Sequence, residues 1–435
     1  MNKSLSERIA GFLESKGWKK AKEPNKADFL FVNMCSVRQS AVDRVYGLIP
    51  KIKKIKLKNQ KLKAVLTGCI LLKDRKNFSE WFDFILPIET LPKWDLILKR
   101  KPKDPFLYFD TVKKNYAGNY LKITPKYTSK ISAFLPIMTG CNNFCSYCVI
   151  PYTRGPEISR PVNEIIKEVK DLVKKGYKEI WLLGQNVANY SSTLKKQGKT
   201  TKIDFARLLE LINNIPGKFW IRFTSPNPEN FSDKLINTIA KCEKVTEYLN
   251  LPVQAGDDEI LKKMNRKYTI SQYKQLVKKI RKKIPNTSLS TDVIVGFPGE
   301  TKKQFEKTAK LFREIKYDLA YIAKYSPRPQ TSAFRLEDNV PEEEKKRREK
   351  VLTEILRKTA FSNNKKYLQK EVEVLVEKHI ENNKWQGKTR TFKTVVFESN
   401  LKDLLGKFVI VKIKKVLPFG LSGELIKICT ENKKN

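Results

Sequence analysis

The segment "AFLPIMTGCNNFCSYCVIPYTRG" (residues 133–155) joins an apolar stretch to a loop that contains three cysteines. Residues 133–138 predict a buried strand, and Cys141, Cys145 and Cys148 follow it in the spacing CxxxCxxC. In barrels of parallel strands, functional groups gather where the strands end. The segment therefore predicts a metal or cofactor site at the end of the first strand of such a barrel.

Five further strand-like segments follow, and amphipathic helix patterns alternate with them. Strands are expected at 133–138, 179–184, 219–224, 247–253, 290–296 and 319–325. Helices are expected at 162–175, 204–214, 229–241, 270–283 and 301–315. Six βα units are two short of a closed eight-fold barrel, so the pattern predicts an α/β fold with a partial (βα)6 barrel at its centre.

The N-terminal residues predict an open α/β domain of their own. Apolar runs at 27–34 and 63–68 suit buried parallel strands, and Ser4 with Glu7 predicts a capping box at the first helix. Cys35 and Cys69 each come just after one of these strands. The two cysteines either face one shared site at the carboxyl ends of the strands or are two unrelated buried thiols.

The C-terminal residues predict a small β-barrel behind a charged connecting helix. The helix is expected at 341–368, and strand-like alternation follows at 371–379, 391–397 and 408–417. The many lysines of this region indicate a nucleic-acid surface, although a solvated barrel face would show the same composition.

Composition limits the classes of function. The 435 residues carry a net charge of +42, which favours a polyanionic partner, although a lysine-rich surface can also be simply solvated. The charge does not separate RNA from DNA or anionic lipid. The single histidine, His379, argues against histidine-based hydrolysis and zinc chemistry. No membrane span or secretion signal is apparent, and clustered cysteines suit a reducing compartment, so a cytoplasmic protein without membrane contact is expected.

The cysteine spacing indicates an iron–sulfur cluster. Zinc sites favour CxxC pairs and need a fourth ligand, and no such ligand follows nearby. A four-iron cluster held by three thiolates leaves one iron open to a small molecule. The isolated Cys242 and Cys429 are most simply small buried hydrophobic residues.

These features resemble the radical S-adenosylmethionine enzymes, whose signature is CxxxCxxC at the end of the first barrel strand. Tyr147, the aromatic residue before the last cysteine, fits that signature. Several segments resemble the methylthiotransferase branch, and the C-terminal barrel resembles its RNA-binding TRAM module. The segments are "GCNNFCSYCVIPYTRGPEISRP", "LLGQNV", "LPVQAGDDEILKKMNRKYT", "TDVIVGFPGET" and "KYSPRPQT". "RFTSPNPENF" and "KTRTFKTVVFE" are most similar to the branch that modifies N6-dimethylallyladenosine in tRNA.

The resemblance implies two 4Fe–4S clusters and S-adenosyl-L-methionine as cofactors. Cys141, Cys145 and Cys148 would be the catalytic cysteines, holding the cluster whose open iron binds S-adenosylmethionine. Cys35 and Cys69 match two of the three cysteines that hold the auxiliary cluster. Residues that match the loops of the cofactor pocket, with plain turn formation as their alternative role, are Tyr147, Gly184, Gln185, Asn186, Gly296 and Pro298.

The resemblance also implies the reaction and the partners. A methylthio group would be added to carbon 2 of N6-dimethylallyladenosine next to the anticodon, so the partners would be the tRNA anticodon stem-loop and a one-electron donor such as flavodoxin or ferredoxin. One alternative is a sister enzyme that acts on threonylcarbamoyl-adenosine tRNA or on a ribosomal protein. Another is an RNA-binding iron–sulfur protein with impaired sulfur insertion.

The sequence departs from the family pattern at its start. The third auxiliary cysteine normally precedes a Met-Asn pair, and here that pair is Met1-Asn2, so a first strand and its cysteine are expected to be missing. Either the start codon is assigned too late or the chain is truncated. The domains are expected at 1–115, a linker at 116–132, the radical S-adenosylmethionine core at 133–340, the connector at 341–368 and the TRAM barrel at 369–430.

Overall fold

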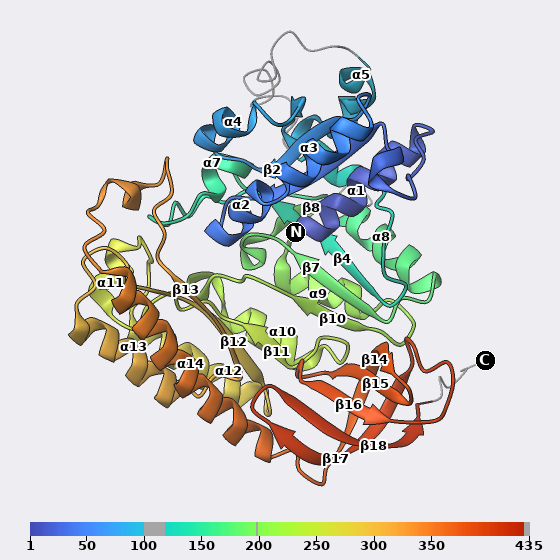
Figure 1. Ribbon diagram of the computed structural model, residues 1–435. Coiled ribbons are helices and arrows are strands. Elements are labelled where there is room, and N and C mark those ends of the chain that lie inside the picture. Colours follow the sequence, from blue (N-terminus) through green and yellow to red (C-terminus); the bar gives the residue numbers. More distant parts are fainter. Residues whose placement is uncertain (100–117, 197–198, 430–435) are drawn as a thin grey trace. The chain divides into compact units, whose positions relative to one another are not determined.

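The computed structural model describes residues 1–99, 118–196 and 199–429, and the chain divides into two compact units (Figure 1). The first unit consists of Met1–Thr128, Pro136–Arg160 and Ser326–Leu336. The second unit consists of Ser129–Leu135, Pro161–Tyr325 and Glu337–Asn435. The three-cysteine loop therefore belongs to the same unit as the N-terminal residues. The expected domain boundary at residue 115 and the start of the linker at 116 lie outside the described residues, and the other boundaries stay predictions.

A parallel sheet in the order β1-β2-β3 forms the centre of the first unit (Figure 1). Its strands are β1 (Phe29–Cys35), β2 (Lys63–Cys69) and β3 (Phe84–Ile85). Successive residues of β2 belong to different hydrophobic clusters, with Val65 in one and Leu66 in the other. The sheet is therefore buried on both faces, which explains the continuous apolar runs and confirms the predicted N-terminal α/β domain.

Helices cover this sheet, and the first of them corrects one prediction. The helices of the first unit are α1 (Asn2–Ser15), α2 (Gln39–Tyr46), α3 (Ile49–Lys58), α4 (Leu72–Phe78), α5 (Trp94–Leu98) and α7 (Ile150–Arg154). The predicted capping box is wrong, because α1 already begins at Asn2 and Ser4 lies inside the helix with its hydroxyl unpaired. The Glu7 carboxylate instead accepts hydrogen bonds from the backbone N–H and the hydroxyl of Thr128, at 3.0 and 2.7 Å.

The six predicted barrel strands are confirmed. They are β4 (Ser132–Pro136), β7 (Glu179–Leu183), β10 (Trp220–Phe223), β11 (Tyr248–Asn250), β12 (Ser288–Val295) and β13 (Leu319–Lys324). The strands pair in the orders β10-β7-β4 and β11-β12-β13, and a parallel bridge between Ile221 and Val245 joins the two groups. Their order in space thus follows their order in the chain, as in a partial barrel.

Helices alternate with these strands (Figure 1), and their starts follow the capping chemistry of the sequence. They are α8 (Val162–Lys174), α9 (Phe205–Asn213), α10 (Asp233–Lys241), α11 (Asp258–Lys263), α12 (Ile270–Lys283) and α13 (Lys302–Ile315). Thr269 and Thr301 form complete capping boxes at α12 and α13. The predicted start at residue 229 is wrong, because Ser232 caps α10 through the Leu235 N–H. A hairpin of β8 (Ser191–Lys196) and β9 (Lys199–Asp204) was not predicted.

The connector and the C-terminal barrel are confirmed. The connector is α14 (Glu342–Lys365), and no helix within residues 1–99, 118–196 and 199–429 is both long and apolar enough to cross a membrane. The barrel closes in the order β14-β15-β16-β18-β17 (Figure 1). Its strands are β14 (Glu371–Glu381), β15 (Lys384–Thr389), β16 (Thr394–Glu398), β17 (Phe408–Leu417) and β18 (Gly420–Ile428).

The turn between β15 and β16 corrects the predicted strand at 391–397. The strand begins only at Thr394, because the chain reverses direction just before it. The Thr389 N–H donates to the Lys393 carbonyl at 3.0 Å, and Phe392 takes a left-handed φ of 64°. Residues 390–393 therefore form a tight turn rather than the first residues of a strand.

Candidate active site

The three-cysteine loop begins and ends at a short antiparallel pair of strands. Strand β5 (Met138–Thr139) pairs with β6 (Ile158–Ser159), and the Cys141 N–H donates to the Gly155 carbonyl at 3.2 Å. Gly140 has a φ of +76°, and a Cβ on it would lie 1.9 Å from the Pro156 carbonyl oxygen. Only glycine can occupy that position without moving the backbone of the opposite end of the loop.

Inside the loop, the backbone turns sharply between the first and the last cysteine. Phe144 has a left-handed φ of 47°, and the Cys148 N–H donates to the Cys145 carbonyl at 2.9 Å. Cys141 is buried, and Cys145 and Cys148 are half-buried. The loop thus has a defined backbone conformation around its three cysteines, and Phe144 at the turn is exposed.

The donor set fits an iron–sulfur cluster better than a single ion. Among the described residues, no three His, Cys, Asp or Glu side chains come together closely enough to hold one metal ion. In a four-iron cluster each thiolate binds a different iron, so the sulfurs stand farther apart than the ligands of one zinc ion. Three cysteines on one loop would bind three of the four irons and leave one iron without a protein ligand.

Cys35 and Cys69 lie side by side at the carboxyl ends of β1 and β2. The strands pair in register, and Cys35 is opposite Cys69. Ser36 fixes this end of the sheet, because its N–H and its hydroxyl both donate to the Cys69 carbonyl, at 3.1 and 2.7 Å. Burial and the neighbouring Cys69 raise the pKa of the Cys35 thiol. The sequence left open whether Cys35 and Cys69 face one site or are unrelated buried thiols, and the structure has them on neighbouring strands at the same end of the sheet.

A buried arginine that the sequence reasoning missed lies at this pair. Arg154 is the last residue of α7, which packs against β2, and its guanidinium interacts electrostatically with Cys69 at the end of that strand. Burial lowers the pKa of the Arg154 guanidinium, but Cys69, Tyr120 and Glu89 raise it, and the net direction is upward. The residue stays charged throughout the accessible pH range. The "YTRG" segment gives no pattern from which this contact could have been predicted.

The loop after β7 carries three of the predicted cofactor residues. Asn186 is buried and bridges two loops of the second unit: its side-chain oxygen accepts from the Asn227 N–H at 2.9 Å, and its amide donates to Asn230 at 2.8 Å. The buried side-chain oxygen of Gln185 has no hydrogen-bond partner, so it is an acceptor that a ligand could use. Gly184 is buried where the strand ends.

Packing explains why the loop after β12 contains a glycine at position 296. The Gly296 N–H donates to the Glu300 carboxylate at 2.7 Å, and a Cβ on Gly296 would lie 2.4 Å from Lys345 Cγ. Close packing against α14 therefore accounts for this residue without a cofactor. Pro298 is buried in the same turn. Binding of a cofactor by Gly296 and Pro298 stays a prediction.

Polar side chains on one face of β11, β12 and β13 form a second feature that the sequence reasoning missed. The Asn250 amide donates to Ser290 and to Asp292, both at 3.1 Å, and Asp292 is in register with Tyr321. Burial raises the pKa of Tyr248, whose hydroxyl accepts from Ser290 at 2.9 Å. Polar residues at alternate positions of the apolar run "STDVIVG" were the available signal.

Three family models match consecutive parts of the chain. Residues 1–86 match the uncharacterized protein family UPF0004, residues 135–312 match the Radical SAM superfamily, and residues 365–426 match the TRAM domain. These ranges agree with the N-terminal sheet, the partial barrel and the closed C-terminal barrel. The Radical SAM match contains the whole three-cysteine loop.

Solved structures share the fold. The radical S-adenosylmethionine methyltransferase TsrM from Kitasatospora setae, solved with tryptophan substrate and a SAM analog bound, matches with a TM-score of 0.55 at 12% identity, over 77% of this chain and 72% of that one. Its structure with cobalamin and a [4Fe-4S] cluster bound gives a TM-score of 0.53 at 13% identity, over 76% and 73% of the two chains. The solved structures show the fold, and together with the Radical SAM match over the cysteine loop the barrel defines a radical S-adenosylmethionine protein.

Curated relatives identify the branch. The tRNA-2-methylthio-N(6)-dimethylallyladenosine synthase of Clostridium tetani is 41% identical over 98% of this chain and 94% of its own length. The synthase of the same name from Clostridium botulinum (strain Hall) is 42% identical over 98% and 95% of the two chains, and that of Alkaliphilus oremlandii is 39% identical over 98% and 90%. The chain belongs to the family of tRNA-2-methylthio-N(6)-dimethylallyladenosine synthases.

Proposed function

We propose that this chain adds a methylthio group to carbon 2 of N6-dimethylallyladenosine next to the anticodon of tRNA. Family membership over nearly the full length supports the substrate. The observation that carries the proposal is the loop of Cys141, Cys145 and Cys148 in the spacing CxxxCxxC, closed at its base by the pairing of β5 with β6 and contained in the Radical SAM match.

In this proposal, Cys141, Cys145 and Cys148 hold a four-iron cluster and leave its open iron to S-adenosylmethionine. The bound cluster and cofactor supply an organic radical that can remove the hydrogen from carbon 2. Gly140 lets the two ends of the loop meet, and Gln185 offers a buried acceptor for a polar cofactor group. Tyr147, Gly184, Asn186, Gly296 and Pro298 are further proposed cofactor-binding residues.

Cys35 and Cys69 would hold the second cluster at the end of the N-terminal sheet. Their adjacent positions in register support this role. Two thiols hold a cluster weakly, so at least one further ligand is needed. We also infer an external one-electron donor such as flavodoxin or ferredoxin, and the cytoplasmic location stays a prediction from the sequence.

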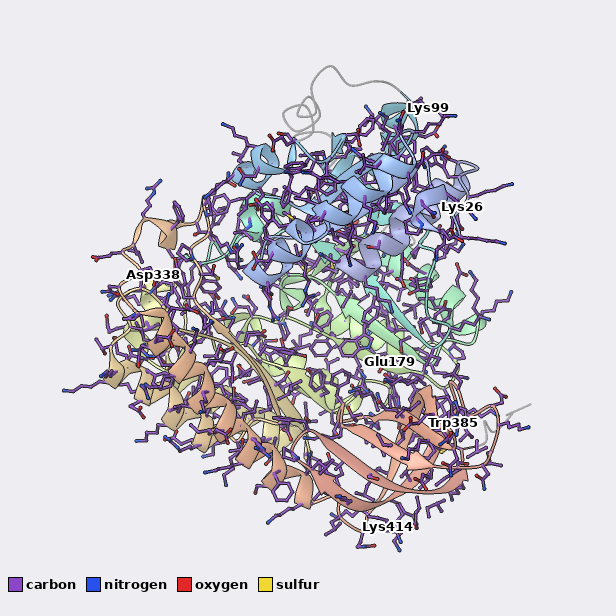
Figure 2. The ribbon with its side chains drawn as sticks, viewed as in Figure 1. Lys26, Lys99, Glu179, Asp338, Trp385 and Lys414 are labelled. Carbon is purple, nitrogen blue, oxygen red and sulfur yellow. The ribbon has the colours of Figure 1, made fainter. Side chains whose placement is uncertain are left out.

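The closed C-terminal barrel offers a surface for tRNA. Figure 2 shows Lys414 at its outer edge, near the end of β17, and Lys415 and Phe419 are exposed on the same hairpin. Lysines bind phosphates by displacing counterions, and an exposed aromatic ring can stack on an unpaired base. We infer that this hairpin contacts the anticodon stem-loop.

The test is an anaerobic assay of the reconstituted protein with S-adenosylmethionine, dithionite and tRNA that carries N6-dimethylallyladenosine, followed by mass spectrometry of the nucleosides. The 2-methylthio product is expected, and Cys145→Ala should form neither this product nor 5′-deoxyadenosine. Product only on threonylcarbamoyl-adenosine tRNA or on a ribosomal protein would overturn the substrate. Cleavage of S-adenosylmethionine without any thiolated product would favour an RNA-binding protein that no longer inserts sulfur.

A further inference from the structure

Arg154 connects the three-cysteine loop to the Cys35/Cys69 pair within the first unit. Helix α7, which follows Cys148 almost directly, contacts β2, and Arg154 is its last residue. Only 6% of Arg154 is exposed. Its guanidinium interacts electrostatically with Cys69, the last residue of β2. A buried cation thus lies beside the pair of thiols.

The guanidinium has hydrogen-bonding capacity that the protein leaves unused. Nη1 of Arg154 is buried and has no partner, and Nη2 makes only a long contact of 3.4 Å with the Asn2 side-chain oxygen. No carboxylate of the described residues forms an ion pair with it. The buried carboxylate of Glu89 acts on Arg154 only from beyond ion-pair distance. A buried charge without a close counter-charge costs several kcal/mol in general, so the retention of Arg154 indicates a closer anionic partner.

A second buried arginine lies near the same pair. Arg328 is 6% exposed, and it donates from Nη1 to the Gln39 side-chain oxygen at 2.7 Å. Its Nε and Nη2 are buried without partners, and it also makes no ion pair with a carboxylate of the described chain. Asp74, Asp43 and Cys35 act on it only through longer-range electrostatics. Arg154 and Arg328 thus both lie near the thiols of Cys35 and Cys69 without an ion-pair partner. This arrangement indicates an anionic group bound at the two thiols.

Resting on the function proposed above, we propose that Arg154 is a positioning residue for an anionic iron–sulfur group bound by Cys35 and Cys69. The iron–sulfur core with its thiolates has a net negative charge, and reduction adds another. The Arg154 guanidinium supplies the compensating charge, and its unused Nη1 donor is available to the bound group. It therefore favours the bound group over the empty site and the reduced form over the oxidised form. Arg328 also favours the bound group and its reduced form, with a smaller effect.

A purely structural arginine would behave differently. If Arg154 only supported the packing of α7 on β2, its loss would lower the stability of the metal-free and the loaded protein equally. A charge-compensating role predicts a larger loss in the loaded protein, because the unpaired cation is unfavourable until the anionic group is bound. The loss of stability of the loaded protein minus that of the metal-free protein measures the coupling free energy between Arg154 and the bound iron–sulfur group.

The experiment isolates the Cys35/Cys69 site in the full-length chain. Cys141, Cys145 and Cys148 are all replaced by alanine, so that bound iron has only the other site. This parent and its Arg154→Gln, Arg154→Lys and Arg328→Gln derivatives are reconstituted anaerobically with ferrous iron and sulfide. Arg8→Gln is the matched control, since Arg8 is equally buried in the same unit but bonds to the Ile123 carbonyl. Iron per chain, iron loss to a chelator, the reduction potential and thermal unfolding with and without iron are measured.

We expect Arg154→Gln to lose iron at least tenfold faster than the parent. Its reduction equilibrium should shift about tenfold towards the oxidised form, which is 59 mV for a one-electron couple. Arg154→Lys should recover part of both effects because it keeps the charge but not the planar fork. Arg328→Gln should show a smaller effect in the same direction, and the destabilisation by Arg154→Gln should be larger with iron than without.

Three results would overturn the proposal. They are a parent that binds no iron, an Arg154→Gln variant with unchanged iron loss and potential, and an Arg8→Gln variant with effects as large as those of Arg154→Gln. None of them touches the function proposed for the whole chain, because cleavage of S-adenosylmethionine by the intact three-cysteine loop is measured separately. Loss of that cleavage in the unaltered chain would instead count against the proposed function.

Discussion

Arg222 and Glu179 form a buried ion pair in the second unit, with Nε of Arg222 2.5 Å from Oε1 of Glu179. The remaining donors of Arg222 reach the C-terminal barrel, where they bind the carbonyls of Thr389 and Arg390 at 2.8 and 2.7 Å. In return, Arg390 binds the Glu247 carboxylate at 2.7 Å. The turn between β15 and β16 is thus joined to the strands of the partial barrel by two arginines that point in opposite directions.

Replacing Arg222 should destabilise the second unit strongly. Its side chain is fully buried and lies between the rings of Trp181, Trp220 and Phe392. We expect Arg222→Met to lower the free energy of unfolding by about 3–5 kcal/mol, because Glu179 would remain as an uncompensated buried charge. Urea unfolding followed by circular dichroism measures this loss.

A matched pair of controls separates charge from packing in that experiment. Glu210→Gln removes an exposed ion pair with Arg207 and should cost less than about 1 kcal/mol. The double variant Arg222→Met/Glu179→Leu should recover much of the lost stability, since both buried charges are then absent. If the double variant were as unstable as Arg222→Met alone, lost packing rather than the stranded carboxylate would be the cause.

The hydrogen bonds between Arg222 and the C-terminal barrel determine how tRNA binding should be tested. Deleting residues 369–435 would leave Arg222 without its carbonyl partners, so a surface substitution is more informative. Lys415→Glu should weaken tRNA binding about tenfold at low salt and reduce the salt dependence, because one phosphate contact is replaced by repulsion. Phe419→Ala should weaken binding with little change in the salt dependence, because stacking is not electrostatic.

Filter binding at several salt concentrations checks both variants. Lys303→Glu is the control, because Lys303 is exposed on α13 outside the C-terminal barrel. Cleavage of S-adenosylmethionine should be unchanged in all three variants. Equal weakening by Lys303→Glu would mean that overall charge, and not the hairpin of β17 and β18, drives the association.

The sequence contained enough information for the strands but not for the contacts between distant segments. Each barrel strand was predictable because its apolar residues are contiguous, and Cys35 and Cys69 were predictable as neighbours because both end parallel strands. The contact of Arg154 with Cys69 depends on how α7 packs against β2, which no local pattern encodes. The hairpin of β8 and β9 was missed for the opposite reason: its Ser, Thr and Lys residues lack an apolar face.

Substituting Gly140 should disturb the three-cysteine loop. Gly140→Ala adds a methyl group 1.9 Å from the Pro156 carbonyl oxygen and also strains a φ of +76°. Gly155→Ala is the matched control in the same loop, because its φ is +71° but nothing lies within 4 Å of the added atom. Both variants carry the backbone strain of a positive φ, on the order of 1–3 kcal/mol, and only Gly140→Ala carries the clash.

We expect Gly140→Ala to retain less than about half of the iron of the parent after reconstitution, whereas Gly155→Ala should remain close to the parent, since a clash moves the cysteines and a local φ penalty does not. Iron analysis and the absorbance of the cluster measure the difference. Equal iron contents in the two variants would show that the close approach to Pro156 is not needed to form the site.

Acid sensitivity should arise in part from the connector helix α14. Arg347 binds both carboxylate oxygens of Glu344, at 2.7 and 2.9 Å, and Arg348 binds one of them at 2.8 Å. The hydrogen bonds from Arg347 and Arg348 lower the pKa of Glu344 from 4.5 to about 2, although partial burial opposes them. A carboxyl group with a lowered pKa in the folded state stabilises the fold above its ordinary pKa and loses that contribution as the pH falls through the folded value.

The stabilisation by Glu344 should therefore be complete above about pH 4.5 and disappear as the pH falls towards 2. Glu344→Gln should be less stable than the parent by about 1 kcal/mol at pH 7, as for a well-oriented surface ion pair, and the difference should shrink steadily between pH 4.5 and pH 3. Urea midpoints across this range measure it, with Glu343→Gln as the control for an exposed neighbour that is bound only to Lys346. A difference that does not change with pH would mean that the amide disturbs the helix by some route other than the lost charge.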